Sequence, residues 1–233
     1  MAPSSPTPPI ELTGHRSRFE GPVHDVSEEL LAALAEICEI ITADDHDPSG
    51  EGSDDERRVA EASRDWWPMA LHWSLQGQVP QLADVVARPT STEEVAAVVS
   101  ACNTARVPVT VAGGRSGVCG ASVPVFGGLV LDTTALAGIV SVDVASGVVE
   151  VLPGTFGPDL EHELQEGHGL SVGHFPQSFD LATVGGWIGA RGAGQYSTRY
   201  GKIEDMVVGL ETVLADGTIV STGGAPAAAA GPD

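Results

Sequence analysis

The residues best suited to chemistry lie in two glycine-rich stretches. The first, Ala112-Gly113-Gly114-Arg115-Ser116-Gly117-Val118, directly follows an apolar segment that is typical of a β-strand. Glycines let successive backbone N–H groups converge on an anion without interference from a Cβ, and Ser116 adds a hydroxyl donor. The spacing is neither G-x-G-x-x-G nor a Walker A loop. It therefore predicts either a phosphate cradle or a glycine turn without a ligand.

The second stretch runs from Gly173 to Asp205 with the sequence GHFPQSFDLATVGGWIGARGAGQYSTRYGKIED. Its five glycines between residues 185 and 194 are poor helix formers and indicate backbone lying close to something flat or charged. Ser178 and Thr183 offer hydroxyl groups. A long loop without secondary structure is unusual inside a compact domain. Ligand contact and an ordinary packed loop both remain open for this stretch.

The elements that must position these stretches alternate between strands and helices. Thr92 is expected to cap a helix over residues 92–105, and a second helix is expected over 158–166. A hairpin turned by Asp216-Gly217 and another turned at residues 145–147 add antiparallel pairs. This pattern predicts an α+β fold. The expected strands cover residues 85–87, 107–112, 129–131, 139–143, 148–152, 207–214 and 218–220.

A helical N-terminal segment is expected before this domain. Ser27 can cap a helix whose apolar residues recur at helical spacing, and residues 57–76 look like a second helical stretch. The apolar residues of the first helix are Leu30, Leu31, Leu34, Ile37, Cys38 and Ile41. Between them, residues 44–56 are rich in acids, Gly, Pro and Ser, which predicts a solvated linker. Their carboxylates do not match an EF-hand, so no metal site is expected. We therefore predict a tail and helical segment over 1–78 and the main domain over 79–233.

Composition limits the possible partners. The 233 residues carry a formal net charge of −21 with 11 Lys and Arg, which argues against nucleic acid and anionic lipid. Three widely spaced cysteines form neither a disulfide framework nor a metal knuckle, which favours a cytoplasmic setting. No signal peptide and no apolar run long enough to span a membrane is recognised. A small-molecule substrate is expected, and a homodimer stays open.

Taken together, the two stretches resemble a known family. A glycine loop after a strand, then P-x-S-x-x-x-T-V-G-G-W and Y-G-x-x-E-D, is similar to the FAD-binding PCMH-type domain of the vanillyl-alcohol oxidase superfamily. The stretch from Pro176 onward is most similar to the alkyldihydroxyacetonephosphate synthase branch and its bacterial FAD-linked oxidase relatives. Asp65-Trp66-Trp67-Pro68 also resembles the bacterial relatives. The resemblance covers residues 57–233 and implies a domain built of two α/β subdomains.

The resemblance implies roles for individual positions. The first loop would wrap the FAD pyrophosphate, residues 176–186 would line the flavin and ribityl region, and residues 189–192 would lie against the diphosphate or ribose. The positions assigned to FAD are Ala112, Gly113, Gly114, Arg115, Ser116, Gly117, Val118, Pro176, Gln177, Ser178, Phe179, Asp180, Leu181, Ala182, Thr183, Gly185, Gly186, Gly189, Ala190, Arg191, Gly192 and Glu204. Glu204 is either such a contact or a surface acid.

Covalent attachment of FAD is not expected. Many relatives attach FAD through a histidine in the first glycine loop, whereas this loop carries Arg115 and no histidine. His174 is either a catalytic or flavin-linking residue or an ordinary loop histidine. The resemblance thus implies non-covalent FAD.

The function that the resemblance implies is hydride transfer from a hydroxy acid or alcohol to flavin. In relatives the domain continues past the last expected hairpin and a substrate domain follows, so we expect this chain to be C-terminally incomplete, with its catalytic residues unknown. A flavin-dependent alkylglycerone-phosphate synthase-like transferase and an inactive FAD-binding fragment are the alternatives.

Overall fold

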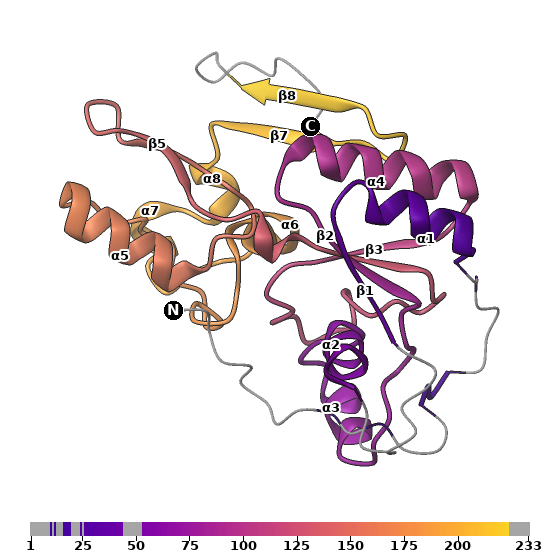
Figure 1. Cartoon of the computed structure of the whole chain (residues 1–233). Helices are drawn as coiled ribbons and strands as arrows, with labels where there is room; N and C mark the ends of the chain where they lie inside the picture. The colour runs from indigo at the N-terminus through magenta and orange to yellow at the C-terminus, as the bar shows by residue number, and fades with distance from the viewer. Residues whose placement is uncertain are drawn as a thin grey trace.

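The computed structural model describes residues 26–43 and 53–223, together with residues 10, 12, 16–19 and 24. Figure 1 shows the elements in chain order. They are α1 (Glu28–Ala35), β1 (Glu39–Thr42), α2 (Asp54–Ala62), α3 (Pro68–Ser74), β2 (Val85–Arg88), α4 (Thr92–Ala105), β3 (Val109–Ala112), β4 (Leu129–Asp132), the 3-10 turn η1 (Thr133–Ala135), β5 (Ile139–Asp143), β6 (Val148–Val151), α5 (Gly157–His168), α6 (Val184–Ala190), α7 (Ser197–Tyr200), α8 (Ile203–Met206), β7 (Gly209–Val213) and β8 (Ile219–Gly223).

A four-stranded sheet with the order β1-β2-β4-β3 organises the first half of the molecule. β2, β4 and β3 run parallel, whereas β1 pairs antiparallel with β2. Because successive side chains of a strand point to opposite faces, Val85 and Ala87 face one hydrophobic cluster and Val86 faces another. α1 and α4 cover the first face and α2 covers the second (Figure 1).

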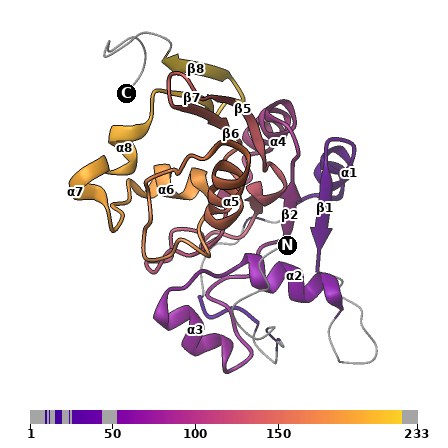
Figure 2. The ribbon, with the colours of Figure 1, turned by 90° about the vertical axis from the view of Figure 1, so that its left-hand side faces the viewer.

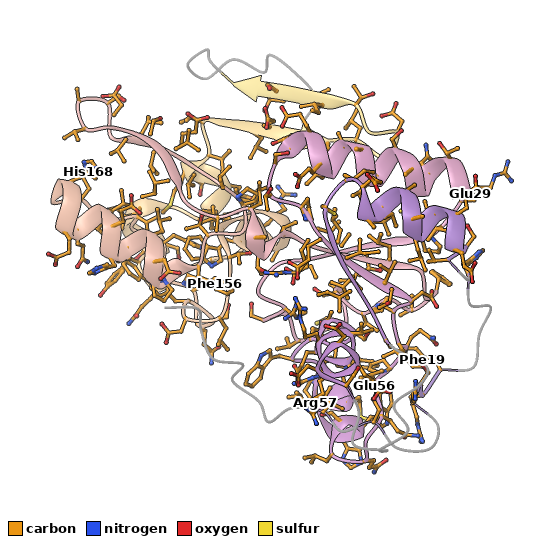
Figure 3. All side chains as sticks on the ribbon, viewed as in Figure 1. Phe19, Glu29, Glu56, Arg57, Phe156 and His168 are labelled. Atoms are coloured by element: carbon orange, nitrogen blue, oxygen red, sulfur yellow. The ribbon has the colours of Figure 1, made fainter. Side chains whose placement is uncertain are left out.

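The second half is built around α5 and α6. Leu160 and Leu164 of α5 pack with Val184 and Trp187 of α6, and the β5–β6 hairpin closes this cluster. Figure 2 shows α5 lying beside this hairpin, and in Figure 3 Phe156 and His168 mark the two ends of α5. The β7–β8 hairpin lies against α4, where the Thr92 hydroxyl donates to Glu211 at 2.7 Å. The α+β fold expected from the sequence is thus confirmed.

Three details differ from the sequence-based expectations. The N-cap of α4 is Ser91, whose hydroxyl accepts from the Glu94 N–H at 3.2 Å, so Thr92 is the first helical residue. The acidic segment expected to be a linker as far as Glu56 ends earlier, because Ser53 caps α2. Residues 44–52 lie outside the described residues. The helical stretch expected over 57–76 is divided between α2 and α3.

Residues on both sides of the boundary expected between residues 78 and 79 share one hydrophobic core. β1 pairs along its whole length with β2, and Leu30 and Leu34 of α1 lie in the same cluster as Leu129 of β4. Burial of apolar side chains therefore joins residues 26–43 to the sheet that follows. Among the helices of the described residues, none has the length and apolar character needed to cross a membrane.

Candidate functional site

The first glycine-rich stretch leaves the carboxyl end of β3 as a loop, residues 113–120, which we call the phosphate loop. No backbone N–H from Gly114 to Gly120 donates a hydrogen bond to another described residue. Arg115 lies in the left-handed region with φ 51°, which turns successive N–H groups toward a common side. Unpaired N–H groups in such a turn form a concave binding site for an anion. The loop therefore has the backbone chemistry that a phosphate group requires.

The second glycine-rich stretch packs directly on this loop. A Cβ on Gly114 would collide with the carbonyl oxygen of Leu181, and a Cβ on Gly113 would collide with the hydroxyl of Thr183. Glycine is thus required at both positions by close approach, while neither has a positive φ. The structure brings together two parts of the chain that the sequence analysis assigned to one cofactor.

Arg115 supplies a cation at the base of the phosphate loop. Its Nη1 lies 3.6 Å from Asp132 Oδ2, close enough for an ion pair, and it is buried without a hydrogen-bond partner among the described residues. Asp132 also attracts Arg88, whose Nε lies 3.8 Å from Oδ2. The other oxygen of the Asp132 carboxylate, Oδ1, accepts hydrogen bonds from the N–H and the hydroxyl of Thr134. The attraction of Asp132 therefore holds the Arg115 guanidinium, and its positive charge, at the phosphate loop.

The segment from Pro176 to Ala182, which the resemblance assigns to the flavin and ribityl region, forms a tight turn. The N–H groups of Leu181 and Ala182 both donate to the carbonyl of Ser178 at 2.9 Å. Thr183 follows as a buried N-cap, whose hydroxyl accepts from the Gly186 N–H at 3.4 Å. The turn holds Leu181 and Thr183 in place against the phosphate loop.

A short helix, α6, contains several of the glycines that the sequence analysis judged poor helix formers. Close packing explains why glycine occurs within this helix, because a Cβ on Gly185 would lie 2.8 Å from Cβ of Pro153. The Gly185 N–H also donates to the Pro153 carbonyl at 2.8 Å. Tertiary contact therefore outweighs the low helix propensity of glycine here.

Glu204 makes an ion-pair network at the end of α6. Its Oε2 accepts from Arg191 Nε at 2.6 Å, and its Oε1 pairs with Lys202 Nζ. These two cations lower the pKa of Glu204, the hydrogen bond from Lys202 contributing most. Arg191 itself has φ 51° and ends α6. Among the described residues Glu204 makes no hydrogen bond to the phosphate loop, so its closest role is to hold Arg191.

His174 is completely buried, which the sequence alone did not indicate. Its ring lies edge-on to Trp187 with centroids 5.0 Å apart, and both ring nitrogens and the Trp187 Nε1 lack hydrogen-bond partners among the described residues. Burial lowers the pKa of His174, which keeps the imidazole neutral at pH 7. A Cβ on Gly194 would lie 3.2 Å from His174 Nδ1. The side chain thus supports the glycine turn after α6 from inside the core.

Known proteins share this sequence and fold. A family model described as an FAD binding domain matches residues 83–223, more than half of the chain. An uncharacterized FAD-linked oxidoreductase of Escherichia coli is 42% identical over 146 residues, which are 61% of this chain and 30% of that protein. The glycolate oxidase subunit GlcD of Bacillus subtilis is 34% identical over 147 residues, covering 63% of this chain and 31% of the subunit.

Solved structures agree with the sequence relatives. A crystal structure of alkyldihydroxyacetonephosphate synthase superposes with a TM-score of 0.76 and 26% identity, covering 92% of this chain and 38% of that one. The chain thus spans about a third of the length of the proteins that it matches. The backbone N–H groups of the phosphate loop, which donate to no described residue, together with the positive charge of Arg115, fit the diphosphate of FAD. The chain belongs to the FAD-binding domain family, of the type found in the vanillyl-alcohol oxidase superfamily, and its cofactor is FAD.

Proposed function

We propose that this chain provides the FAD-binding part of a flavin-dependent oxidoreductase that acts on a hydroxy acid or alcohol. The observation that carries the proposal is the contact of Gly113 and Gly114 with Leu181 and Thr183, which joins two glycine-rich stretches into one site. Bound FAD supplies the hydride acceptor. The residues of this chain bind and orient that cofactor.

The phosphate loop would bind the diphosphate through the N–H groups of residues 114–118, with Arg115 neutralising charge. The turn over residues 176–182 would line the flavin and ribityl region. Residues 189–192 would lie beside the diphosphate or ribose, held there by the Arg191–Glu204 pair. The resemblance to FAD-binding domains implies these assignments, and the contacts of Leu181 and Thr183 with Gly113 and Gly114 support them.

The hydroxy-acid substrate is supported by the relatives. They include the glycolate oxidase subunit of Bacillus subtilis and a D-lactate dehydrogenase of Anaerostipes hadrus that is 36% identical over 140 residues. The second candidate is a flavin-dependent transferase, because the alkyldihydroxyacetonephosphate synthase of Dictyostelium discoideum is 35% identical over 152 residues. Since these matches cover 25–31% of the relatives, anaerobic bleaching by hydroxy acids is measured on a protein of their full length. Bleaching of the flavin by a hydroxy acid would support the oxidoreductase. The absence of bleaching with every hydroxy acid tested would favour the transferase.

The cofactor site is tested on the chain itself. FAD should raise the melting temperature, with a stabilisation of about 2.7 kcal/mol at a free FAD concentration near 100 times the dissociation constant. Riboflavin, which lacks the diphosphate, should shift the melting temperature far less. Equal shifts from FAD and riboflavin would remove the phosphate loop from the site.

Two further features complete the proposal. We expect FAD to be released into the supernatant by acid precipitation, because the phosphate loop contains no histidine that could link it.

A cytoplasmic location is supported by the cysteines, since Cys38, Cys102 and Cys119 are all free thiols.

A further inference from the structure

The phosphate loop is held at two places by two remote segments. Leu181 and Thr183 hold its beginning, at Gly113 and Gly114. Its second half, from Gly117 to Gly120, contacts a different segment, Asp65-Trp66-Trp67, which precedes the region matched by the family model. Residues 65–67 contact the loop through both backbone and side-chain atoms.

Three contacts join residues 65–67 to the phosphate loop. The Trp66 N–H donates to the Gly117 carbonyl at 2.9 Å. A Cβ on Gly120 would lie 3.5 Å from the indole ring of Trp67, so the ring covers the loop at that point. The third contact is made by Asp65, whose Oδ2 would lie 3.6 Å from a Cβ on Gly117. The segment therefore contacts the loop at two places, Gly117 and Gly120.

Asp65 fixes the shape of its own segment. Its Oδ1 accepts from the Trp67 N–H at 2.9 Å, which closes an Asx turn over residues 65–67. The residue is 2% exposed, and its Oδ2 is buried without a hydrogen-bond partner among the described residues. A buried carboxylate oxygen without a partner costs free energy. The contact of Oδ1 with the Trp67 N–H is therefore the interaction through which this buried side chain acts.

The segment is attached to a rigid support. The Ser63 hydroxyl, just before it, donates to the Val59 carbonyl at 2.7 Å and accepts from the Ala83 N–H at 2.9 Å. On the other side, the Trp67 ring stands edge-on to Trp73 of α3, with centroids 5.3 Å apart. These contacts give residues 65–67 a fixed position from which to hold the loop.

We propose that Asp65 and Trp67 are positioning residues of the FAD site. They hold the Gly117–Gly120 half of the phosphate loop in the conformation whose free N–H groups receive the diphosphate. The inference rests on the FAD site proposed above and extends that site to a segment outside residues 83–223. Asp65 acts through the turn that its Oδ1 closes. Trp67 acts through its ring, which packs against Gly120.

The test compares Asp65→Ala with Asp65→Asn, whose amide oxygen can still accept from the Trp67 N–H. Asp216→Ala is the matched control, because Asp216 closes an equivalent turn by accepting from the Thr218 N–H at 2.9 Å in the β7–β8 hairpin. Two quantities are measured in the 233-residue chain: the FAD dissociation constant, and the hydrogen exchange of the Trp66 amide without FAD. The amide of Val130 in β4 reports on global stability.

We expect Asp65→Ala to weaken FAD at least tenfold and to speed Trp66 exchange at least tenfold while Val130 is unchanged. Asp65→Asn and Asp216→Ala should stay within threefold of the wild type in both measurements. FAD affinity within twofold of the wild type in Asp65→Ala would overturn the proposal. So would equal acceleration at Trp66 and Val130, or an Asn variant as weak as the Ala variant.

Trp67→Leu provides a second variant in case Asp65→Ala does not fold, and it should also weaken FAD at least tenfold. Unchanged FAD affinity in Trp67→Leu would count against the role of the ring. Failure of the wild-type chain to bind FAD would overturn the proposed function instead. The Trp66 exchange would then still decide whether Asp65 holds the loop.

Discussion

The carbonyl oxygen of Leu181 lies directly against the Cα of Gly114, although the two residues belong to separate stretches of the chain. The approach is closer than any side chain would permit, so the contact depends on the absence of a Cβ at position 114. The position of the phosphate loop relative to the turn over residues 176–182 depends on this contact. Substitution at Gly114 should therefore affect both the fold and the cofactor site.

We expect Gly114→Ala to lower the melting temperature and to weaken FAD at least tenfold, about 1.4 kcal/mol of binding free energy. The Cβ must displace either the loop or the Leu181 carbonyl. Gly167→Ala in α5 is the control, because its Cβ would meet nothing within 4 Å and its φ is not positive. That variant should gain up to about 1 kcal/mol of stability from helix propensity. A Gly114→Ala protein with unaltered FAD affinity would contradict the assignment of the loop.

Cys119 offers a chemical reporter inside the phosphate loop. It is exposed, whereas burial raises the pKa of Cys102 to about 11 and also raises the pKa of Cys38. At pH 7.5 we therefore expect one fast-reacting thiol with an aromatic disulfide reagent, and Cys119→Ser should abolish that fast phase. Saturating FAD should slow the reaction at least fivefold, and riboflavin should not. Equal reactivity with and without FAD would place the cofactor elsewhere.

The buried imidazole of His174 predicts a pH dependence of stability. Burial lowers its folded pKa below the usual value near 6.5, so the unfolded chain binds a proton more readily than the folded one. Stability should be unaffected by this group above the unfolded pKa and should fall as the pH drops through about 6.5 toward the folded value. The maximal slope is about 1.4 kcal/mol per pH unit.

Urea denaturation of the wild type and His174→Gln between pH 8 and pH 5 measures this effect. The variant should lose less stability than the wild type over the acidic part of that range. An identical dependence in both proteins would show that His174 titrates alike in the folded and unfolded states.

Gly189 tests whether the end of α6 contacts the cofactor. A Cβ at this helical position would meet nothing within 4 Å of the protein. Gly189→Ala should therefore raise the unfolding free energy by up to about 1 kcal/mol. If residues 189–192 lie against FAD, the same variant should weaken FAD, so stability and affinity move in opposite directions. A variant that gains stability and keeps full FAD affinity would remove Gly189 from the site.

Much of the fold was accessible from local sequence patterns. The helix over residues 92–105 was predicted with its observed bounds, and the Asp216-Gly217 hairpin forms as expected. Such features depend on neighbours in sequence, because caps and tight turns use the backbone of nearby residues. Gly113 and Gly114 were assigned to the cofactor from the sequence, but their packing on Leu181 and Thr183 could not be predicted, because long-range contacts leave no periodic signal.

Other features depended on tertiary packing and could not be predicted. Ile37, Cys38 and Ile41 continue the helical spacing of α1 in the sequence, so the expected helix was too long: α1 ends at Ala35 and Glu39–Thr42 forms β1. The pairing with β2 decides the backbone there, and it is visible only in the assembled sheet. The burial of His174 follows from Trp187 and Gly194 closing around it. Asp65 was noted for its resemblance to relatives, but its contact with Gly117 could not be inferred from composition.

The pairing of β1 with β2 has a consequence for the edge of the sheet. β1 covers the hydrogen-bonding edge of β2, whose residues Val85, Val86 and Ala87 are buried and apolar. Without residues 26–43, that edge would present unpaired N–H and C=O groups beside an apolar surface, which is a template for intermolecular strand addition and aggregation. β1 thus protects this edge of β2 from pairing with another chain. A version trimmed to residue 83, where the match to the family model begins, would lose this protection, together with α1 and α2, which pack on the two faces of the sheet.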